Sequence, residues 1–389
     1  MSYLHRRGQP RDSRPGNILI LVLLFLVVLV GVVAFAVDLG YLLVAKTELQ
    51  VSADAAALAG TWELIDQSMA GKESSDCITA ARATAQNFAG LNSVCTNSPA
   101  LDANDANGED GEIVIGTISS FNDPNATMTY DDPSAYNAVK VKVRRTSGQN
   151  GIVPFFFARV FGFDGAPAEA TATAGFFKQA VGFRVPADGN LGILPFALDI
   201  DTWNKWENGE LTDDNWSWDA KTGAVVSGSD GIPEMNLYPQ DTGSSANRST
   251  VNIGGSNNST SRVARQILDG ITADDLDYHG GSLEFGDDGT MVLEADPGIS
   301  AGFKDELATI IGQPRVIPIF SELTGNGGKA EYTIVKYVGV RVVEVDLTGG
   351  DKRLMIQPAV VVMKGLIPSN GESGSGTMEY VYSPPYLIR

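Results

Sequence analysis

Few side chains in this sequence are of the kinds that activate nucleophiles or bind transition metals. Only two histidines and two cysteines occur in 389 residues. His5 lies close to the N-terminus, and His279 stands in the sequence Asp-Tyr-His-Gly-Gly, which is typical of a surface loop rather than of a catalytic base. The two histidines fall on opposite sides of the apolar run at 18–37, so a zinc site is not expected either. We therefore expect no catalytic residue, no metal site and no cofactor.

A stretch rich in Asp, Asn and Gly between Leu101 and Glu112 has the composition of a calcium loop. If Gly108 takes the sixth position of an EF-hand loop, Ala103 falls at the first position and Val114 at the twelfth, where carboxylates are required. Neither side chain can supply an oxygen ligand, so the pattern favours a solvated loop. Paired carboxylates for glycoside hydrolysis cannot be picked out by spacing among 47 acidic residues.

Tryptophan is concentrated in one region. Four of the five tryptophans fall within sixteen residues, bordered by aspartates; they are Trp203, Trp206, Trp216 and Trp218. Aromatic rings beside carboxylates suit stacking on sugars, which gives a hypothesis of contact with a surface glycan. The same residues also suit aromatic lids over a β core, in which each indole N–H finds a polar partner. Both interpretations stay open at this point.

The element that positions the rest of the chain is the apolar run Ile18–Val37. Its twenty residues are uncharged, and a helix of this length spans roughly 30 Å, the thickness of a bilayer's hydrocarbon core. The preceding tail, residues 1–17, carries four arginines against one aspartate. Basic residues beside a span stay in the cytoplasm. We therefore expect a single-pass protein of the inner membrane, with a cytoplasmic N-terminus and a periplasmic or extracellular body.

Two alternatives concern processing of this N-terminus. A cleaved signal peptide normally has an apolar core of about 7 to 15 residues, shorter than this run, although Ala34-Phe35-Ala36 resembles a cleavage site. A prepilin peptidase would cut after Gly16, but Leu21 stands where prepilins usually carry glutamate. We expect the run to be retained as an anchor in the lipid bilayer.

The charge distribution excludes one class of function. The whole chain carries a net charge of −19; the first sixteen residues contribute +3, which leaves −22 for the remainder. Phosphate contacts need clustered lysines and arginines, and so acidic a body argues against them. We expect no nucleic-acid partner.

Beyond the span the helix is expected to continue to roughly Asp66. Small and apolar residues recur at spacings that place them on one face: Leu42, Leu49, Ala53, Ala56 and Gly60. Alanines favour helix and let another element approach closely. We expect this face, with Asp38 and Gly40 at the exit from the span, to pack against the protein's own body or against a neighbouring subunit. A stalk without a partner is the simpler alternative.

These residues resemble the N-terminal signature of the TadG-like proteins, which belong to the Tad (tight adherence) machinery that assembles Flp pili. The resemblance covers about fifty residues and consists of the apolar span, Asp38-Leu39-Gly40, Lys46-Thr47-Glu48-Leu49-Gln50 and Ala53-Asp54-Ala55-Ala56-Ala57-Leu58-Ala59-Gly60. It implies a role in pilus assembly or adhesion through contacts with other Tad proteins, and no enzyme. Many TadG-like proteins carry a von Willebrand A domain, but its Asp-x-Ser-x-Ser motif is not matched by Asp199-Ile200-Asp201-Thr202-Trp203.

The remaining pattern predicts an α+β protein. A second helix is expected at Cys77–Phe88, and strands at 112–116 and 138–144, where apolar and polar residues alternate. Residues 38–178 are expected to form a TadE/TadG-like extracytoplasmic domain, with the long Ala-rich helix packed on an antiparallel sheet as in pilin-like folds. Residues 179–389 are expected to form a β-rich C-terminal domain, with helices at 261–268 and 303–311 and strands between 315 and 362.

Two further features lie beyond the span. Cys77 and Cys95 are the only cysteines, and in an oxidising compartment we expect them to form one disulfide, which would contribute about 3 kcal/mol. The aromatic run at 155–163 is expected to form a short buried helix that ends at Gly162. An exposed patch for a partner or for the membrane surface is the alternative.

The sequence therefore predicts a membrane-anchored structural component that helps to assemble or present Flp pili through protein contacts in the cell envelope. The alternative from another class is a surface adhesin that binds carbohydrate through its tryptophan-rich segment. A glycosidase is a more distant third.

Overall fold

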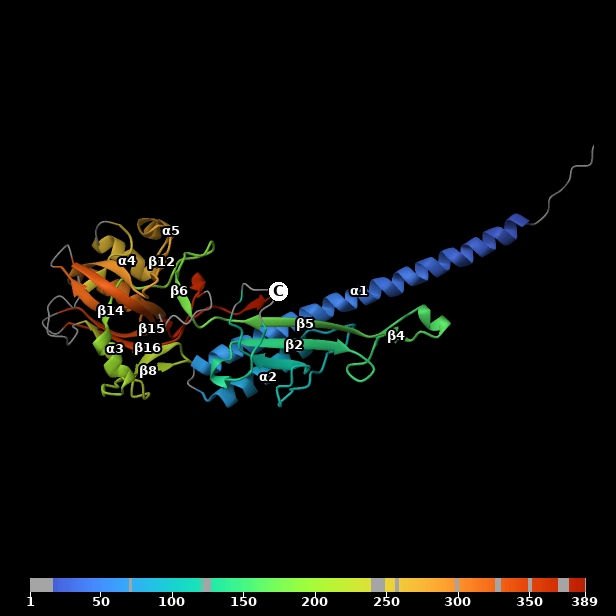
Figure 1. Ribbon diagram of the computed structural model, residues 1–389, viewed down its shortest axis with the longest axis horizontal. Coiled ribbons are helices and arrows are strands. Elements are labelled where there is room, and N and C mark those ends of the chain that lie inside the picture. Colours follow the sequence, from blue (N-terminus) through green and yellow to red (C-terminus); the bar gives the residue numbers. More distant parts are fainter. Residues whose placement is uncertain are drawn as a thin grey trace, which may run out of the picture. The chain divides into compact units, whose positions relative to one another are not determined.

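The computed structural model describes residues 17–69, 72–119, 121, 127–238, 249–255, 259–297, 301–325, 330–348, 352–369 and 378–388 (Figure 1). The chain divides into two compact units, each assembled from separate stretches of sequence. Unit 1 comprises Met1–Ala57, Thr84–Val114 and Lys140–Ala172; unit 2 comprises Leu58–Ala83, Ile115–Val139 and Thr173–Arg389.

Helix α1 (Asn17–Met69) is one continuous helix of 53 residues. Its first part is exposed on nearly all sides from Ile18 to Val37, and within the described residues it is the one helix long and apolar enough to cross a membrane. An apolar segment in lipid must satisfy every backbone polar group internally, which helical hydrogen bonds achieve. The predicted N-terminal apolar helix is confirmed.

The second part of α1 is buried on one face only. Leu49, Ala53 and Ala56 are fully buried at spacings of four and three residues. Beside them, the Ser52 hydroxyl donates to the carbonyl of Ala89 in helix α2 (Ser74–Leu91) at 3.2 Å. The Gln50 amide donates to the carbonyl of Thr171 at 3.3 Å. The small-residue face of α1 therefore packs within its own chain.

One sheet has four strands, in the order β1 (Ile113–Gly116), β2 (Ala138–Arg145), β5 (Ala168–Gly175) and β21 (Tyr386–Ile388). Most side chains of β2 alternate between buried and partly buried, as expected for a strand with one face on a core. The last strand of the chain, β21, pairs antiparallel with β5, placing Tyr386 opposite Gly175. The C-terminal residues thus complete a sheet that begins more than two hundred residues earlier.

Unit 2 is dominated by an eight-stranded sheet. Its strands are β7 (Leu198–Asp199), β10 (Met235–Tyr238), β11 (Ser249–Val251), β13 (Met291–Pro297), β14 (Pro314–Thr324), β15 (Ala330–Asp346), β16 (Arg353–Pro358) and β19 (Met378–Glu379). The longest strand, β15, pairs with β13, β14, β16 and β19 and therefore organises the sheet.

A change of register in β15 lets the same strand serve two apolar cores. Tyr332 and Ile334 belong to one core, whereas Val338 and Val340, at positions of the same parity, belong to the other. The pairing with β14 shifts between Ile334 and Lys336, and one extra residue moves the following side chains to opposite faces. Three helices contribute side chains to the second core: α3 (Ile200–Glu207), α4 (Thr260–Asp269) and α6 (Lys304–Thr309).

The shorter elements form hairpins and connections. The paired strands are β3 (Val153–Pro154) with β4 (Gly165–Ala166), β8 (Trp216–Asp219) with β9 (Ala224–Ser227), β17 (Val361–Val362) with β20 (Val381–Tyr382), and β6 (Ala180–Phe183) between β12 (Leu283–Glu284) and β18 (Leu366–Pro368). The remaining helices are α5 (Ala273–Leu276) and the 3-10 turns η1 (Pro133–Ala135), η2 (Ala158–Phe161), η3 (Asp277–His279) and η4 (Ala301–Phe303).

The α+β class is confirmed, but two local expectations are wrong. The aromatic run at 155–163 is not buried: η2 forms there, and Val160 and Phe161 are among its exposed side chains. The sequence shows that this segment is apolar, but it does not show whether other residues of the chain bury it.

The expected disulfide between Cys77 and Cys95 is also absent from the structure, and both side chains are buried. The Cys77 thiol donates to the carbonyl of Lys72 at 3.5 Å. Cys95 stands in a left-handed turn, with φ at 51°, and its backbone N–H donates to the Glu48 carboxylate at 2.7 Å. Each cysteine has its own hydrogen-bonding contacts, which the number of cysteines in the sequence does not indicate.

The two faces of α1 should respond differently to truncation. Leu49→Ala removes a fully buried side chain and should lower the free energy of unfolding by about 2–5 kcal/mol. Leu43→Ala, at an exposed position on the same helix, should change it by less than about 0.5 kcal/mol. Chemical unfolding of both variants in detergent micelles measures the difference, and equal losses would contradict the assigned face.

Thiol chemistry tests the state of the cysteines. The folded protein should react with no thiol reagent, because both sulfur atoms are buried, and the protein unfolded without reductant should show two reactive thiols. Mass spectrometry after alkylation counts them. A protein that gains reactive thiols only after reduction would contradict this expectation.

Candidate functional site

The residue at the end of the apolar run, Asp38, is buried and holds a distant hairpin. Its carboxylate accepts the backbone N–H groups of Phe156 at 2.7 Å, Phe157 at 3.1 Å and Ala158 at 2.7 Å. These residues lead into η2, whose N-cap residue Phe157 makes no side-chain capping bond. Free N–H groups at the start of a helical turn attract an anion, and Asp38 supplies it from another element.

The surroundings of Asp38 favour its charged form. Burial by itself would raise the pKa of Asp38, but the hydrogen bonds from Ala158, Phe156 and Phe157 outweigh it and hold the pKa below its ordinary value. Asp38 is therefore an ionised carboxylate at neutral pH, with its negative charge met by backbone dipoles. The side chain is only 4% exposed, so water contributes little.

A second set of contacts fixes the loops beside α1. The Glu48 carboxylate accepts the N–H of Cys95. The buried guanidinium of Arg145 donates to the carbonyl oxygens of Val94 at 2.9 Å and Gly151 at 2.8 Å. A buried cation needs such acceptors, because an unpaired charge in the interior is costly. The hydrogen bond with Cys95 and then burial raise the pKa of Tyr41, the remaining polar side chain here.

The predicted docking residues are mostly used inside the chain. Leu49, Ala53, Ala56 and Gly60 are buried, as is Asp38. Only Gly40 is open, since a Cβ atom built there would meet no atom within 4 Å.

The open side of α1 carries a different apolar stripe. Leu43, Val44 and Val51 are exposed outside the apolar run, and Gly40, Val44 and Val51 follow one another on the same side of the helix. Sequence reasoning selected the small-residue face and missed this stripe. The spacing of the stripe was visible, but its exposure was not.

The four tryptophans do not form one exposed platform. Trp203 is fully buried and its indole N–H donates to the Glu379 carboxylate at 2.8 Å. Trp206 is partly buried, with its ring centroid 5.4 Å from that of Trp203. Trp216 and Trp218 are partly buried in β8, and the Arg341 guanidinium lies 4.1 Å from the Trp218 ring centroid. These rings serve packing, and Arg341 makes a cation–π contact with one of them.

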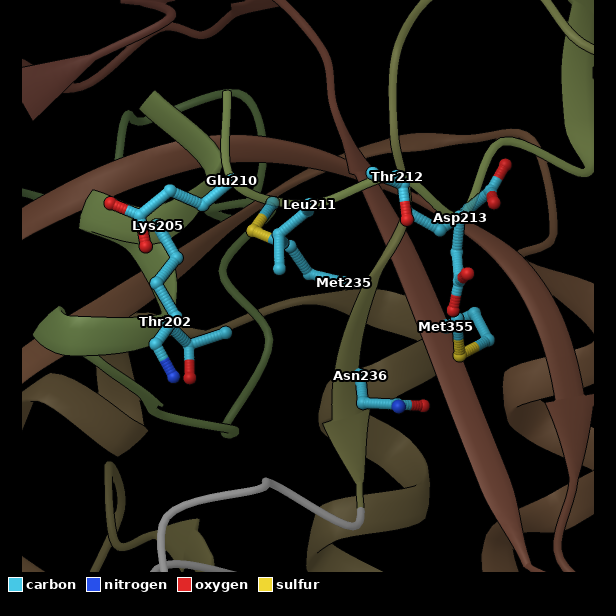
Figure 2. A pocket seen from close by; sticks show the side chains of 10 residues that line it. Thr202, Lys205, Glu210, Leu211, Thr212, Asp213, Met235, Asn236 and Met355 are labelled. Atoms are coloured by element: carbon cyan, nitrogen blue, oxygen red, sulfur yellow. The ribbon is translucent and has the colours of Figure 1, made fainter. Parts of the chain in front are cut away.

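A small pocket in unit 2 lies near this segment. Figure 2 shows Lys205 and Glu210 on one side of it and Asp213 and Met355 on the other. Its volume is about 160 Å³, below the roughly 300–1,000 Å³ typical of small-molecule sites. None of the four tryptophans lines it.

The buried carboxylate beside this pocket has a structural role. Glu234 accepts the N–H of Asn215 at 2.9 Å and that of Trp216 at 2.8 Å. The Gln357 amide also donates to it, at 3.2 Å. Burial raises the pKa of Glu234 above its ordinary value. Across the described ranges, no three His, Cys, Asp or Glu side chains are grouped so that they could hold a metal ion.

We call the hydrogen bonds from the backbone of residues 156–158 to the Asp38 carboxylate the Asp38 clamp. It should be sensitive to substitution. Asp38→Asn replaces one acceptor oxygen with a donor, so the amides of Phe156, Phe157 and Ala158 should exchange with solvent deuterium about tenfold faster or more. Asp54→Asn is the matched control, since Asp54 lies on the same helix and accepts a hydrogen bond from the Gln50 side chain at 2.7 Å. If exchange of residues 156–158 is unchanged in Asp38→Asn, the clamp does not hold the hairpin.

The same protection should depend on pH. The pKa of Asp38 in the folded protein lies below the ordinary value of 3.8. The stabilisation of residues 156–158 by the ionised Asp38 carboxylate is therefore complete above pH 3.8. It is lost only as the pH falls through the lower folded pKa. Exchange at 156–158, corrected for intrinsic rates, should therefore accelerate below that point in the wild type and show no such step in Asp38→Asn.

Two family models match the N-terminal part of the chain. Residues 16–72 match a family described as putative Flp pilus-assembly TadE/G-like, and residues 59–174 match one described as putative Tad-like Flp pilus-assembly. The two matches run from the start of α1 to the end of β5. Neither the curated proteins nor the solved structures give a significant match. Over residues 16–174, the chain is therefore similar to Tad-type Flp pilus-assembly families.

Proposed function

We propose that the protein is a membrane-anchored assembly component of a Tad-type Flp pilus system that acts through protein contacts in the cell envelope. The observation that carries this proposal is α1, which continues without a break from an exposed apolar run into a packed body. The family matches support a role in pilus assembly and fit a protein without enzymatic activity.

We place the anchor in the inner membrane, with the N-terminus in the cytoplasm and the body outside it. The basic tail before α1 supports this orientation, because positive residues beside a span remain on the cytoplasmic side. The bond from Gln50 of α1 to the carbonyl of Thr171 in β5 supports a pilin-like arrangement of a long helix on a sheet.

The proposed docking surface is the exposed stripe of α1 around Gly40, Val44 and Val51. Beyond Asp38 the opposite face of α1 is already buried within the chain, which leaves this side free to receive another helix. Gly40 leaves room for close approach of a second backbone, as small residues do where helices cross in membranes. The partners that fit are helices of other Tad proteins that, like α1, extend beyond the membrane.

No observation favours the adhesin alternative. A glycan platform needs exposed rings, and Trp203 is fully buried while the other three tryptophans of the segment are partly buried. The glycan hypothesis is therefore not carried further.

The substitution Gly40→Leu tests the proposed docking surface without lowering the stability of the fold. The substitution fills open space and replaces glycine with a better helix former, so the free energy of unfolding should not fall. Blocking close approach should reduce co-purification with Tad inner-membrane proteins by about tenfold, equivalent to about 1.4 kcal/mol.

Lys46→Leu is the control for this experiment, because Lys46 is also exposed on α1 but lies off the stripe. It should leave co-purification unchanged. Equal recovery of partners with wild-type protein and Gly40→Leu would refute the stripe as the docking surface.

A further inference from the structure

The hairpin β3–β4 presents an aromatic tip, residues 156–163. The tip is closed at its neck by the bond from the Phe155 N–H to the Asp164 carbonyl at 3.0 Å. Inside it, η2 ends at Gly162, whose φ of 86° lies in the left-handed region that favours glycine. The large apolar side chains of the tip are all exposed: Phe156, Phe157, Val160, Phe161 and Phe163.

This exposure is unfavourable in water. Val160 is 84% exposed and Phe161 is 76% exposed, although both are side chains that the hydrophobic effect drives out of water. Contiguous apolar patches of this kind mark sites of contact with a protein or a membrane. The one charged side chain in the tip is Arg159, which is exposed as well.

The Asp38 clamp fixes where the tip lies along α1. Asp38 follows the last residue of the apolar run and binds the backbone of residues 156–158. Three residues further along α1, the Tyr41 ring packs edge-on against Phe156, with ring centroids 4.9 Å apart. In Figure 1 the hairpin labelled β4 reaches from its sheet toward the N-terminal part of α1. The tip is therefore tethered at the level where the helix leaves its apolar run.

We propose that the aromatic tip inserts into the interface of the bilayer that α1 crosses, at the C-terminal end of the span, as a second membrane anchor. Lipid that covers the last residues of the run must reach the tip, because the clamp holds the tip beside them. Aromatic side chains are favoured at this depth. Arg159 places a positive charge where lipid phosphates lie, whereas the chain as a whole is acidic.

The surroundings of the aromatic tip favour lipid over a protein as the partner that covers it. The apolar run beside the tip is itself exposed from Ile18 to Val37 and requires a lipid cover. A protein partner would have to cover the tip within that same lipid boundary. The proposal needs only that α1 spans the bilayer, so it is independent of the docking stripe and of any Tad partner.

Fluorescence in vesicles tests the insertion. The full-length variants Val160→Cys and Phe161→Cys carry the environment-sensitive fluorophore NBD and are reconstituted into vesicles of phosphatidylethanolamine and phosphatidylglycerol. A nitroxide lipid reports contact with the acyl boundary, where interfacial segments sit about 5–10 Å deep. The control is Val51→Cys, an exposed valine thirteen residues beyond Asp38 and about 20 Å further along α1. The native cysteines are buried and should not be labelled.

Both tip probes should emit at shorter wavelength than the Val51 probe and lose several-fold more intensity to the nitroxide lipid. Tip probes that emit as in water would overturn the proposal. Blue-shifted emission without quenching would also overturn it, because the tip would then be covered by protein, such as a second copy of this chain. Thermal unfolding of each labelled variant, matched to the wild type, establishes that the exposed substitutions leave the fold intact.

Discussion

A carboxylate buried at the end of an apolar run is the interaction on which the membrane-proximal region depends. Asp38 cannot lie in hydrocarbon without a high cost, so it marks where α1 must leave the membrane. Once buried by protein, it needs donors, and the backbone of Phe156, Phe157 and Ala158 provides them. One ionised group therefore sets both the end of the span and the position of a hairpin more than a hundred residues away.

Helix α1 has two parts that differ in exposure, the apolar run and the part beyond Asp38 that is buried on one face. In the apolar run almost every side is exposed, as a helix surrounded by lipid requires. Beyond Asp38, small residues such as Ala53 and Ala56 let the helix approach its own chain, and Ser52 bonds directly to α2. Since that face is occupied, the docking surface that we propose lies on the opposite side, around Gly40.

Unit 2 is organised around β15, the longest strand of its eight-stranded sheet. The shift of register after Ile334 lets one strand supply two cores. Trp203 fills one of these cores and bonds to Glu379, so its large apolar area stabilises packing.

Much of the fold follows from local sequence pattern. The apolar run, the second helix and the strands near 112–116, 138–144 and 315–362 were predictable, because periods of 3.6 and two residues encode which face of an element is apolar. The signature from Asp38 to Gly60 likewise indicated the family. Asp38 itself was selected from the sequence, but its role as the acceptor for residues 156–158 was not.

Tertiary structure alone decided what each apolar or reactive group meets. The tryptophans are neighbours in sequence but do not share an exposed face, the two cysteines are held by separate local contacts, and the run at 155–163 has no cover of its own. The last strand, β21, joins β5 across more than two hundred residues. Periodicity is a property of one segment, whereas burial depends on which distant segments the whole chain brings against it, so the sequence determined the elements and their faces and only the packed structure determined their partners.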